Sequence, residues 1–337
     1  MNEMKIGVVG AGIIGRYHIK NIQEKVPGLS ISGVYSPNLD INWVKQQGIP
    51  QGTRDFNDIL ANKNIHGIAI FSATKFHANL IKESIEAGKK YIFCEKPVST
   101  DLDELKKLHQ LAQEQDCRVM VGYNRRFDEG LQEIAQERKA GTLGEVQRIS
   151  IYNMDGQRPR ISFLKHSGGF FYDMVIHDFD SVRFLSGAEV TEVTAIGDIL
   201  IEPGLRDFDD VDTASIMMRL SNNGHAMIQG SRENSAGYYQ EYKVFGSKEN
   251  REVSNFGQSR VKRMTRQGTS INEPFPLYAG RYASSLVNEF IAFSKVCNQA
   301  SSVPIGLEDC IKAVEIAKAA YLSHKQSRTV SIAEVAE

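Results

Sequence analysis

Apolar and polar positions follow two different patterns along this chain. Up to about residue 123, short and fully apolar runs alternate with longer stretches that repeat apolar residues at helical spacing. Fully apolar strands separated by helices are typical of a parallel sheet that helices cover on both faces. The pattern predicts strands over 5–10, 31–36, 66–72, 91–94 and 118–123, with helices that include 77–88 and 101–115.

Two residues mark expected helix ends. Gly88 is placed to end helix 77–88, because glycine readily takes the left-handed conformation that follows a last helical turn. Thr100 is predicted to cap helix 101–115 through its hydroxyl group. Asp101 then falls in the first turn, where a negative charge suits the helix dipole.

After about residue 124, strand-like pieces follow one another directly, which indicates an antiparallel sheet. Two of them are joined by "SNNG", and Asn223-Gly224 is predicted to form a type I′ hairpin turn. The expected strands are 145–154, 189–199, 212–220, 225–232 and 242–247, and the expected helices are 173–185, 282–297 and 307–324.

These two patterns predict two domains. Residues 1–123 are expected to form an α/β domain of the Rossmann type, a doubly wound parallel sheet. Residues 124–337 are expected to form an α+β domain with a mostly antiparallel open sheet.

The composition of the chain limits the kinds of partner that it is expected to bind. The chain has 337 residues, with 40 Lys plus Arg against 41 Asp plus Glu and a formal net charge of −1. This balance argues against nucleic acid or an anionic membrane as a partner, because both favour a basic surface. No run reaches the 18 or so apolar residues of a membrane span, and the first residues lack a cationic leader, so cytoplasm is expected. The widely spaced Cys94, Cys117, Cys297 and Cys310 form no C-x-x-C pair, so neither a metal site nor a disulfide framework is expected.

A glycine-rich turn follows the first predicted strand. Gly10-Ala11-Gly12-Ile13-Ile14-Gly15 matches G-x-G-x-x-G and opens a helix, which is the context that dinucleotide binding requires. Gly10 makes the tight turn, Gly12 lets backbone N–H groups approach a pyrophosphate, and Gly15 allows close packing of the helix on the sheet. The helix N-terminus adds partial positive charge.

The end of the second strand carries Ser36 where a carboxylate commonly holds the ribose diol. A serine does not repel a 2′-phosphate, yet no arginine follows immediately to bind one, and Asp40 lies nearby in the sequence. NAD is therefore the expected cofactor, and NADP is not excluded.

Lys96 stands at the end of the fourth predicted strand, in "YIFCEKPVS". The carboxyl ends of parallel strands are where open α/β sheets bind ligands. Pro97 favours an extended backbone at Lys96 and stiffens the corner, which fixes the approach of the ammonium group.

The stretch "SGGFFYDMVIHDFD" over 167–180 mixes large apolar residues with acids and a histidine. At about 100° per residue, Asp173, His177 and Asp180 share one face of the predicted helix. Asp178 falls on the apolar side, where it needs a hydrogen-bond partner, and is expected to be structural.

"GAGIIG", "CEKP", "VGYNRRFD" and "SGGFFYDMVIHDFD", in this order, resemble the glucose–fructose oxidoreductase / inositol dehydrogenase / rhizopine-catabolism family, Gfo/Idh/MocA. The resemblance covers essentially the whole chain, and the segments at 125–128 and 167–187 look most like those of inositol 2-dehydrogenases. It implies a two-domain oxidoreductase that uses NAD or NADP on sugars, polyols and related rings. Residues 1–123 are then the dinucleotide-binding Rossmann domain, and residues 124–337 are the domain that binds substrate and mediates oligomerisation.

The resemblance also implies a catalytic set of Lys96, Asp173 and His177. His177 is the expected general acid and base, Asp173 its partner, and Lys96 the cation that positions the substrate oxygen. On the cofactor side, the resemblance implies contacts from the loop after the third predicted strand and from the acid before Lys96. These residues are Ser72, Thr74, His77 and Glu95, and Lys96 itself is also expected to contact the cofactor.

Substrate contacts are implied at Arg126, Asp155 and Tyr238. An ion pair of Arg126 with Asp128 or Glu129 is the alternative to substrate binding. In "AGYYQEY", tyrosine and glutamate at 239 and 241 replace the aspartate and arginine of the inositol dehydrogenase pattern, which puts inositol itself in question but not polyol chemistry.

The leading functional hypothesis is NAD-dependent oxidation of a cyclic polyol, myo-inositol to its 2-keto product. One alternative is an NADP-linked reductase or dehydrogenase of a sugar, anhydrosugar or keto-sugar. Another is a non-catalytic dinucleotide-binding sensor, against which the intact Lys96, Asp173 and His177 argue. An exposed sheet face in the second domain predicts a homo-oligomer, either a dimer or a tetramer.

Overall fold

The structure is a computed structural model that describes residues 3–259, 261, 263–270 and 273–336. The chain divides into two compact units, one of Met1–Asn124 with Leu286–Ile311 and the other of Arg125–Ser285 with Lys312–Glu337. The sequence pattern places 286–311 in the second domain, whereas in the structure this segment packs with the first unit. Aromatic packing accounts for this difference, because Phe290 and Phe293 both contact Phe93 of the first unit.

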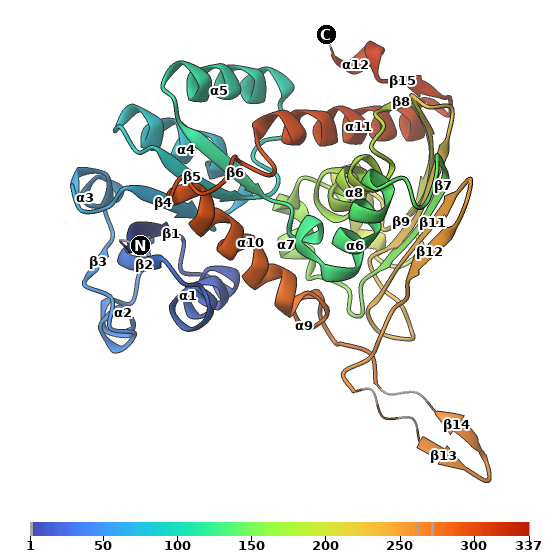
Figure 1. The fold of residues 1–337 in the computed structure, drawn as a ribbon, viewed down its shortest axis with the longest axis horizontal. Helices are drawn as coiled ribbons and strands as arrows, with labels where there is room; N and C mark the ends of the chain where they lie inside the picture. The colour runs from blue at the N-terminus through green and yellow to red at the C-terminus, as the bar shows by residue number, and fades with distance from the viewer. Residues whose placement is uncertain (1–2, 260, 262, 271–272, 337) are drawn as a thin grey trace. The chain divides into compact units, whose positions relative to one another are not determined.

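The first unit is built on a parallel sheet with the strand order β3-β2-β1-β4-β5-β6. This is the doubly wound order of a Rossmann fold, so the predicted fold class is confirmed. Helices α4 and α5 cover one face, and α1 and α10 cover the other (Figure 1). The strands are β1 (Met4–Val9), β2 (Leu29–Tyr35), β3 (Gln51–Thr53), β4 (Gly67–Ile70), β5 (Tyr91–Glu95) and β6 (Arg118–Gly122); the helices are α1 (Ile13–Lys25), α2 (Ile41–Gln46), α3 (Phe56–Ala61), α4 (His77–Glu86), α5 (Leu102–Glu114) and α10 (Ala283–Cys297), with a short 3-10 turn η1 (Thr74–Phe76).

One of the two predicted helix ends in this unit is confirmed and the other is wrong. Gly88 follows the C-cap of α4 with a φ of 78°, as expected for the residue that ends a helix. Helix α5 is capped by Asp101 rather than Thr100, because the Asp101 carboxylate accepts the N–H groups of Asp103 and Glu104. Ser99 supports this cap through its Oγ, which accepts the N–H of Asp101.

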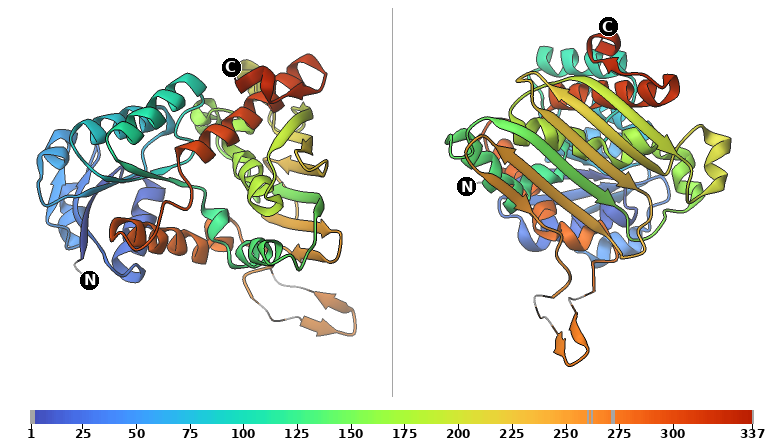
Figure 2. Two further views of the ribbon diagram at one scale, coloured as in Figure 1. Left: turned by 45° about the horizontal axis from the view of Figure 1, so that its top comes forward. Right: turned by 90° about the vertical axis from the view of Figure 1, so that its right-hand side faces the viewer.

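The second unit is built on a sheet of strand order β12-β11-β7-β10-β9-β8-β15, in which only the described pair β7–β10 is parallel. The predicted mostly antiparallel sheet is therefore confirmed. Its core lies between the sheet and helices that include α6, α8 and α11, and Figure 2 shows the opposite face of the sheet without helices on it. The strands are β7 (Val146–Met154), β8 (Val190–Asp198), β9 (Thr213–Leu220), β10 (His225–Ser231), β11 (Tyr239–Gly246), β12 (Asn250–Val253) and β15 (Val330–Ser331), and the helices are α6 (Glu129–Lys139), α7 (Ile161–Ser167), α8 (Ile176–Ser186), α9 (Tyr278–Arg281), α11 (Leu307–Gln326) and α12 (Ala333–Ala336), with 3-10 turns η2 (Asn124–Phe127) and η4 (Pro203–Phe208).

The hairpin between β9 and β10 is present, but the predicted type I′ turn is wrong. Leu220 donates its N–H to the carbonyl of Gly224 and accepts the N–H of Asn223, which closes a three-residue loop. Asn223 alone takes a left-handed conformation, with a φ of 63°, and Gly224 is not among the glycines with positive φ. A type I′ turn needs positive φ at both central residues.

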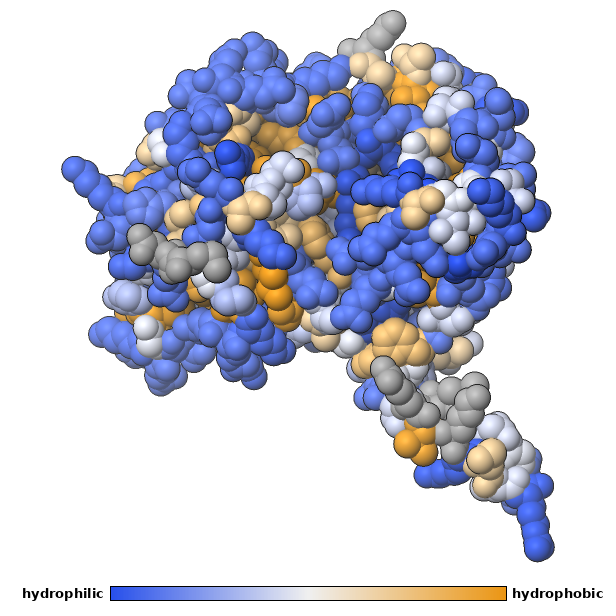
Figure 3. Space-filling view, in the orientation of Figure 1, coloured by the Kyte–Doolittle hydropathy of each residue, from blue (hydrophilic) through white to orange (hydrophobic). Residues whose placement is uncertain are grey.

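A separate hairpin of β13 (Arg263–Thr265) and β14 (Gly268–Ser270) projects from the second unit (Figure 1). The face of the molecule in Figure 3 is mostly hydrophilic. Among the described helices, none has the length and apolar character needed to cross a membrane.

Candidate functional site

The glycine loop joins β1 to α1, and neighbouring backbone atoms leave no space for a side chain at two of its glycines. A Cβ added at Gly10 would lie 2.8 Å from the backbone of Phe71, and one at Gly15 would lie 2.1 Å from the carbonyl oxygen of Gly10. Gly10 also has a φ of 98°, which side chains rarely adopt. Both positions therefore require glycine for the turn itself.

The same loop leaves its outer side open. A Cβ added at Gly12 would meet nothing within 4 Å. Gly12 is the N-cap of α1, has no side-chain cap, and is followed by a first turn without acids, in which Ile13 is 89% exposed. Ile14 follows in this turn. Uncapped N–H groups and the positive end of a helix dipole bind anions, so these residues fit the pyrophosphate of a dinucleotide.

Ser36 directly follows β2, as predicted. It is half-buried, and its N–H donates to the carbonyl of Thr53 at 3.4 Å. The nearby Asp40 is engaged elsewhere, because its carboxylate caps α2 by accepting the N–H groups of Asn42 and Trp43. Asp40, whose negative charge could disfavour the 2′-phosphate of NADP, therefore has a local structural role in capping α2.

His77 ties together the loops that follow β4 and β5. Its side chain is buried, with Nδ1 2.8 Å from the carbonyl oxygen of Pro97 and Nε2 2.9 Å from that of Ser72. Burial lowers the pKa of His77. Because a neutral imidazole has one N–H, it donates to one of these carbonyls. Ser72 and Thr74, the other predicted cofactor contacts of this loop, lie just after β4 and at the start of η1.

Glu95 is the last residue of β5 and Lys96 follows it, at the carboxyl end of the strand, where open parallel sheets bind ligands. Glu95 Oε1 lies 2.9 Å from Nε2 of His18, and Oε2 accepts the backbone N–H of Lys96 at 3.3 Å. His18 is itself buried and stacks on Phe71 with ring centroids 4.7 Å apart. The glutamate before the proposed catalytic lysine is thus held from two sides.

In the second unit, the predicted continuous helix 173–185 is wrong at its start. Residues 170–174 form a single π turn, closed by the N–H of Val175 bonding to the carbonyl of Phe170, and α8 begins only at Ile176. Gly168 and Gly169 precede the turn with φ values of 96° and 90°. The glycines are needed for this entry, because a Cβ at Gly169 would also approach the Asp210 carboxylate to 3.1 Å.

Asp173 and His177 fall on either side of the junction between the π turn and α8, and both are half-buried. Asp173 Oδ2 accepts a hydrogen bond from Arg232 at 2.9 Å. Arg232 is buried at the end of β10 and lies over the ring of Phe170. The arginine compensates the charge of Asp173 and fixes its carboxylate.

The two acids that follow on α8 are both buried and paired with arginines. Asp178 accepts hydrogen bonds from Arg125, Asn153 and Gln240, so the prediction that it has a hydrogen-bond partner is confirmed. Burial opposes the charge of Arg125, but the adjacent Asp178 carboxylate outweighs it and holds the pKa of the guanidinium well above its ordinary value.

Asp180 was expected on the same ionisable face as Asp173 and His177, but it is 1% exposed and belongs to a different cluster. Arg126 donates to it through Nε at 2.8 Å and through a second nitrogen at 2.6 Å. The expected alternative partner of Arg126, Asp128, instead pairs with Arg281 at 2.8 Å. Substrate binding by Arg126 stays a prediction, with much of its guanidinium occupied by Asp180.

Asp155 and Tyr238, the other predicted substrate contacts, are brought together. Strand β11 pairs with β7 with Tyr239 opposite Met154, and Asp155 and Tyr238 are the next residues beyond this pair. Asp155 is half-buried, whereas Tyr238 is buried and donates to Gln240 at 3.3 Å. Burial raises the pKa of the Tyr238 phenol well above its ordinary value, so it acts as a neutral hydrogen-bonding group.

Three buried residues near these positions escaped the sequence reasoning: His18, Arg232 and Glu289. Glu289 carried a usable signal, since it is the only acid in the apolar stretch 286–293. His18 and Arg232 carried none, because their partners lie 77 and 59 residues away in the sequence.

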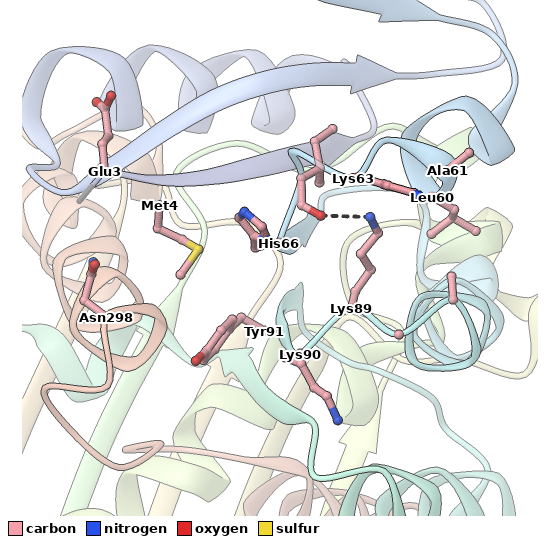
Figure 4. A pocket seen from close by; sticks show the side chains of 13 residues that line it. Glu3, Met4, Leu60, Ala61, Lys63, His66, Lys89, Lys90, Tyr91 and Asn298 are labelled. Carbon is pink, nitrogen blue, oxygen red and sulfur yellow. Dashed lines mark hydrogen bonds between the residues drawn. The ribbon is translucent and has the colours of Figure 1, made fainter.

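A cavity of about 730 Å³ in the first unit lies at the amino ends of the strands, whereas Lys96 follows the carboxyl end of β5. Figure 4 shows the side chains that line the cavity. Met4 and Tyr91, which begin β1 and β5, line it, and Lys89 donates to the carbonyls of Asn62 and Ile65 at its wall. Ligands of open α/β sheets bind at the carboxyl ends of the strands, so this hollow at the amino ends is not the candidate site.

Comparison with known proteins agrees with this architecture. Residues 4–123 match the family described as "Oxidoreductase family, NAD-binding Rossmann fold", and residues 131–250 match the GFO/IDH/MocA C-terminal domain. The uncharacterized oxidoreductase YrbE of Bacillus subtilis is 35% identical over 98% of this chain and 97% of its own length. The myo-inositol 2-dehydrogenase of Thermotoga maritima is 30% identical over 98% of this chain and 99% of its own.

A solved structure adds a liganded relative. The scyllo-inositol dehydrogenase from Lactobacillus casei, with bound NAD(H) and scyllo-inositol, superposes with a TM-score of 0.91 at 27% identity and covers 98% of this chain and 100% of its own. With matches to both domains of the family and a relative at 35% identity along nearly its full length, the chain belongs to the GFO/IDH/MocA family of oxidoreductases.

Proposed function

We propose that this protein is an NAD-dependent dehydrogenase that oxidises a ring hydroxyl of a cyclic polyol, with myo-inositol and its 2-keto product as the leading pair. The observation that carries the proposal is the similarity, along nearly the full chain, to proteins named as inositol dehydrogenases. The residues proposed for chemistry, Lys96, Asp173 and His177, are all present in this chain.

The proposed roles rest on the family resemblance, and the local contacts within each unit are compatible with them. When bound, NAD supplies the hydride acceptor. His177 removes the hydroxyl proton as the carbinol carbon loses its hydride, so the alcohol becomes a ketone and the proton passes to the imidazole. Asp173, held by Arg232, stabilises the imidazolium that forms. Lys96, whose backbone N–H is held by Glu95, positions the substrate oxygen.

On the cofactor side, Gly10, Gly12, Gly15 and the first turn of α1 would hold the pyrophosphate. Ser36 would contact the ribose next to the adenine. One observation keeps the NADP-linked sugar enzyme as a second candidate: Ser36 leaves no carboxylate at that place, and the Asp40 carboxylate is used in capping α2.

A substrate panel tests the proposal. The protein is incubated with NAD⁺ or NADP⁺ and a set of inositols and aldoses, while the absorbance of the reduced nicotinamide is followed. We expect turnover with NAD⁺ and at least one inositol. Tight binding of the dinucleotide without turnover of any polyol or sugar would instead favour a non-catalytic sensor.

Two pairs of variants test the assigned roles. His177→Ala is expected to lower kcat by about 10²–10⁴-fold, the usual contribution of a general acid–base residue, and Lys96→Ala should also lower kcat strongly. The matched controls are His66→Ala and Lys107→Ala, which alter exposed side chains and should leave kcat unchanged. Equal activity in His177→Ala and its control would refute the role of His177.

We further propose a dimer or tetramer that forms through the open face of the β7–β12 sheet. Strand pairing places Ile196 and Met217 on the same side of the ladder, and they are 74% and 62% exposed. Exposed apolar side chains that gather on one sheet face mark interaction surfaces. Sedimentation equilibrium tests this, and a monomer at all concentrations would contradict it.

The four cysteines are free, as in proteins of a reducing compartment, which supports the proposed cytoplasmic location. Cell fractionation tests it.

A further inference from the structure

Three ionisable side chains from three elements meet in the interior of the first unit. They are His18 of α1, Glu95 at the end of β5 and Glu289 of α10, and one donor or acceptor atom from each lies within 4.8 Å of the other two. His18 is 1% exposed and Glu289 is fully buried. The surroundings are aromatic, since Phe290 packs on both His18 and Phe93.

The two glutamates differ in how many hydrogen bonds their carboxylate oxygens make. Both carboxylate oxygens of Glu95 are engaged, one by His18 and the other by the backbone N–H of Lys96. Neither oxygen of Glu289 has a hydrogen-bond partner among the described residues, although its side chain faces Glu95 and His18. An ionised carboxylate without a partner in an apolar interior is highly unfavourable, and a neighbouring negative charge makes it more so.

We propose that Glu289 carries a proton at neutral pH and is a positioning residue for Lys96. The proton turns Glu289 into a donor toward Glu95, so the cluster holds one negative charge rather than two. That charge stays on Glu95, where His18 and the N–H of Lys96 orient it. The function of this arrangement rests on the proposed role of Lys96 in the dehydrogenase reaction.

The groups around the cluster support this distribution of charge. Burial, and then the charge of Glu95, raises the pKa of Glu289 well above its ordinary value. Burial also opposes ionisation of Glu95, but its hydrogen bond to His18 and the charges of His18, Lys96 and His77 outweigh burial and lower its pKa. These groups come from α1, from the start of α4 and from the loop after β5, and Cys94 of β5 also lies in the field of Glu95, whose charge adds to burial in raising the pKa of that thiol.

Infrared spectroscopy of the full chain tests the proton directly. At pH 7 we expect the C=O stretch of a neutral carboxylic acid, and we expect Glu289→Gln to abolish it. The matched control is Glu86→Gln, which alters an exposed glutamate of α4 and should leave the band in place. This measurement needs no substrate, so it remains decisive even if the proposed dehydrogenase activity fails.

Two results would overturn the proposal. One is the lack of a neutral carboxylic acid band at pH 7. The other is stoichiometric binding of Zn²⁺ by the wild-type chain that Glu289→Gln removes, since a cation held by the three side chains would displace the proton. Titration with Zn²⁺, followed by equilibrium dialysis, distinguishes these cases.

Kinetics then test the positioning role with an accepted polyol and NAD⁺. Glu289→Leu removes the donor and is expected to lower kcat about thirtyfold, the scale of a lost hydrogen bond to a charged group. Glu289→Gln restores a neutral donor and should lower kcat only about threefold, since a weaker amide donor replaces the acid. KM for NAD⁺ should change little in either variant.

The pH profile separates positioning from general damage. As pH rises and Glu289 loses its proton, two negative charges would face each other and kcat of the wild type should fall. Glu289→Gln has no proton to lose and should keep its kcat farther into the alkaline range. Identical pH profiles for wild type and Glu289→Gln would overturn the positioning role.

Discussion

The two units neutralise their buried acids by different means. In the second unit, Asp178 is paired with Arg125, and Asp180 is paired with Arg126. A guanidinium stays charged at every pH at which the protein is folded. These carboxylates are therefore compensated by partners whose charge does not vary, and the two consecutive arginines bind α8 to the start of the unit.

In the first unit, Glu95 and Glu289 face each other and His18. There, the second negative charge is proposed to be neutralised by a proton on Glu289, and this proton can dissociate as pH rises. The comparison teaches that burial alone does not define how an acid behaves. An acid paired with arginine has a partner whose charge does not change with pH, whereas an acid that faces another acid and a histidine has partners that titrate. The first arrangement suits a scaffold, and the second suits a position next to a proposed catalytic lysine.

The largest expected effect comes from neutralising an arginine-paired acid. Asp178→Asn should lower the free energy of unfolding by about 3–5 kcal/mol, because it leaves the buried charge of Arg125 uncompensated. The three groups that donate hydrogen bonds to the Asp178 carboxylate would remain, and the N–H₂ group of the asparagine would face one of them as a second donor. Urea unfolding of both proteins measures the difference.

The control for this variant is Asp207→Asn, which changes an exposed acid of η4 and should shift the free energy of unfolding by less than about 0.5 kcal/mol. A loss no larger in Asp178→Asn than in this control would show that the arginine pairs do not stabilise the second unit, and the contrast between the units would disappear.

A pH series sharpens the other side of the comparison. The folded-state pKa of Glu289 is raised above the ordinary 4.5, so the folded protein keeps a proton that the unfolded chain releases. The stabilisation is complete below pH 4.5 and declines as pH rises until the folded-state pKa is passed, by at most about 1.4 kcal/mol per pH unit.

Glu289→Gln should lack this decline, so the free energy of unfolding of the variant minus that of the wild type should grow steadily above pH 4.5. Asp207→Asn should show no such trend. A difference between wild type and Glu289→Gln that is constant with pH would mean that Glu289 is not protonated in the folded state.

The sequence predicts the first unit well because its signals are local. Apolar runs mark strands β1, β2, β4, β5 and β6, and the glycine spacing marks the turn into α1. The errors at Thr100 and at Asn223-Gly224 are also local, but they depend on which of two adjacent residues takes a given conformation. Composition and spacing do not distinguish such neighbours.

The rest of the site was not predictable from local patterns. The π turn before α8 depends on Gly169 lying against Asp210, and Asp173 is held by Arg232, 59 residues away. The cluster of His18, Glu95 and Glu289 joins residues from both ends of the chain. Helical periodicity placed Asp180 beside His177, but the pairing with Arg126 decided its surroundings. Contacts between distant residues override periodicity here.

A charge added at a solvent-accessible position is expected to have the smallest effect on stability. It provides a third case to compare with the buried acids, because water compensates its charge. Ser36→Asp places an acid at the end of β2 on a half-buried, solvent-accessible position. It should change the free energy of unfolding by less than about 0.5 kcal/mol, because water rather than an arginine or a proton compensates the charge. An acid there should hold the ribose 2′-hydroxyl of NAD and repel the 2′-phosphate of NADP.

The dissociation constants of both dinucleotides, measured by quenching of protein fluorescence, should therefore diverge. We expect Ser36→Asp to raise the preference for NAD over NADP by about tenfold, equivalent to about 1.4 kcal/mol. Gln113→Glu adds a charge to the exposed surface of α5 and should leave the preference unchanged. If Ser36→Asp leaves the preference unchanged as well, residue 36 does not contact the ribose.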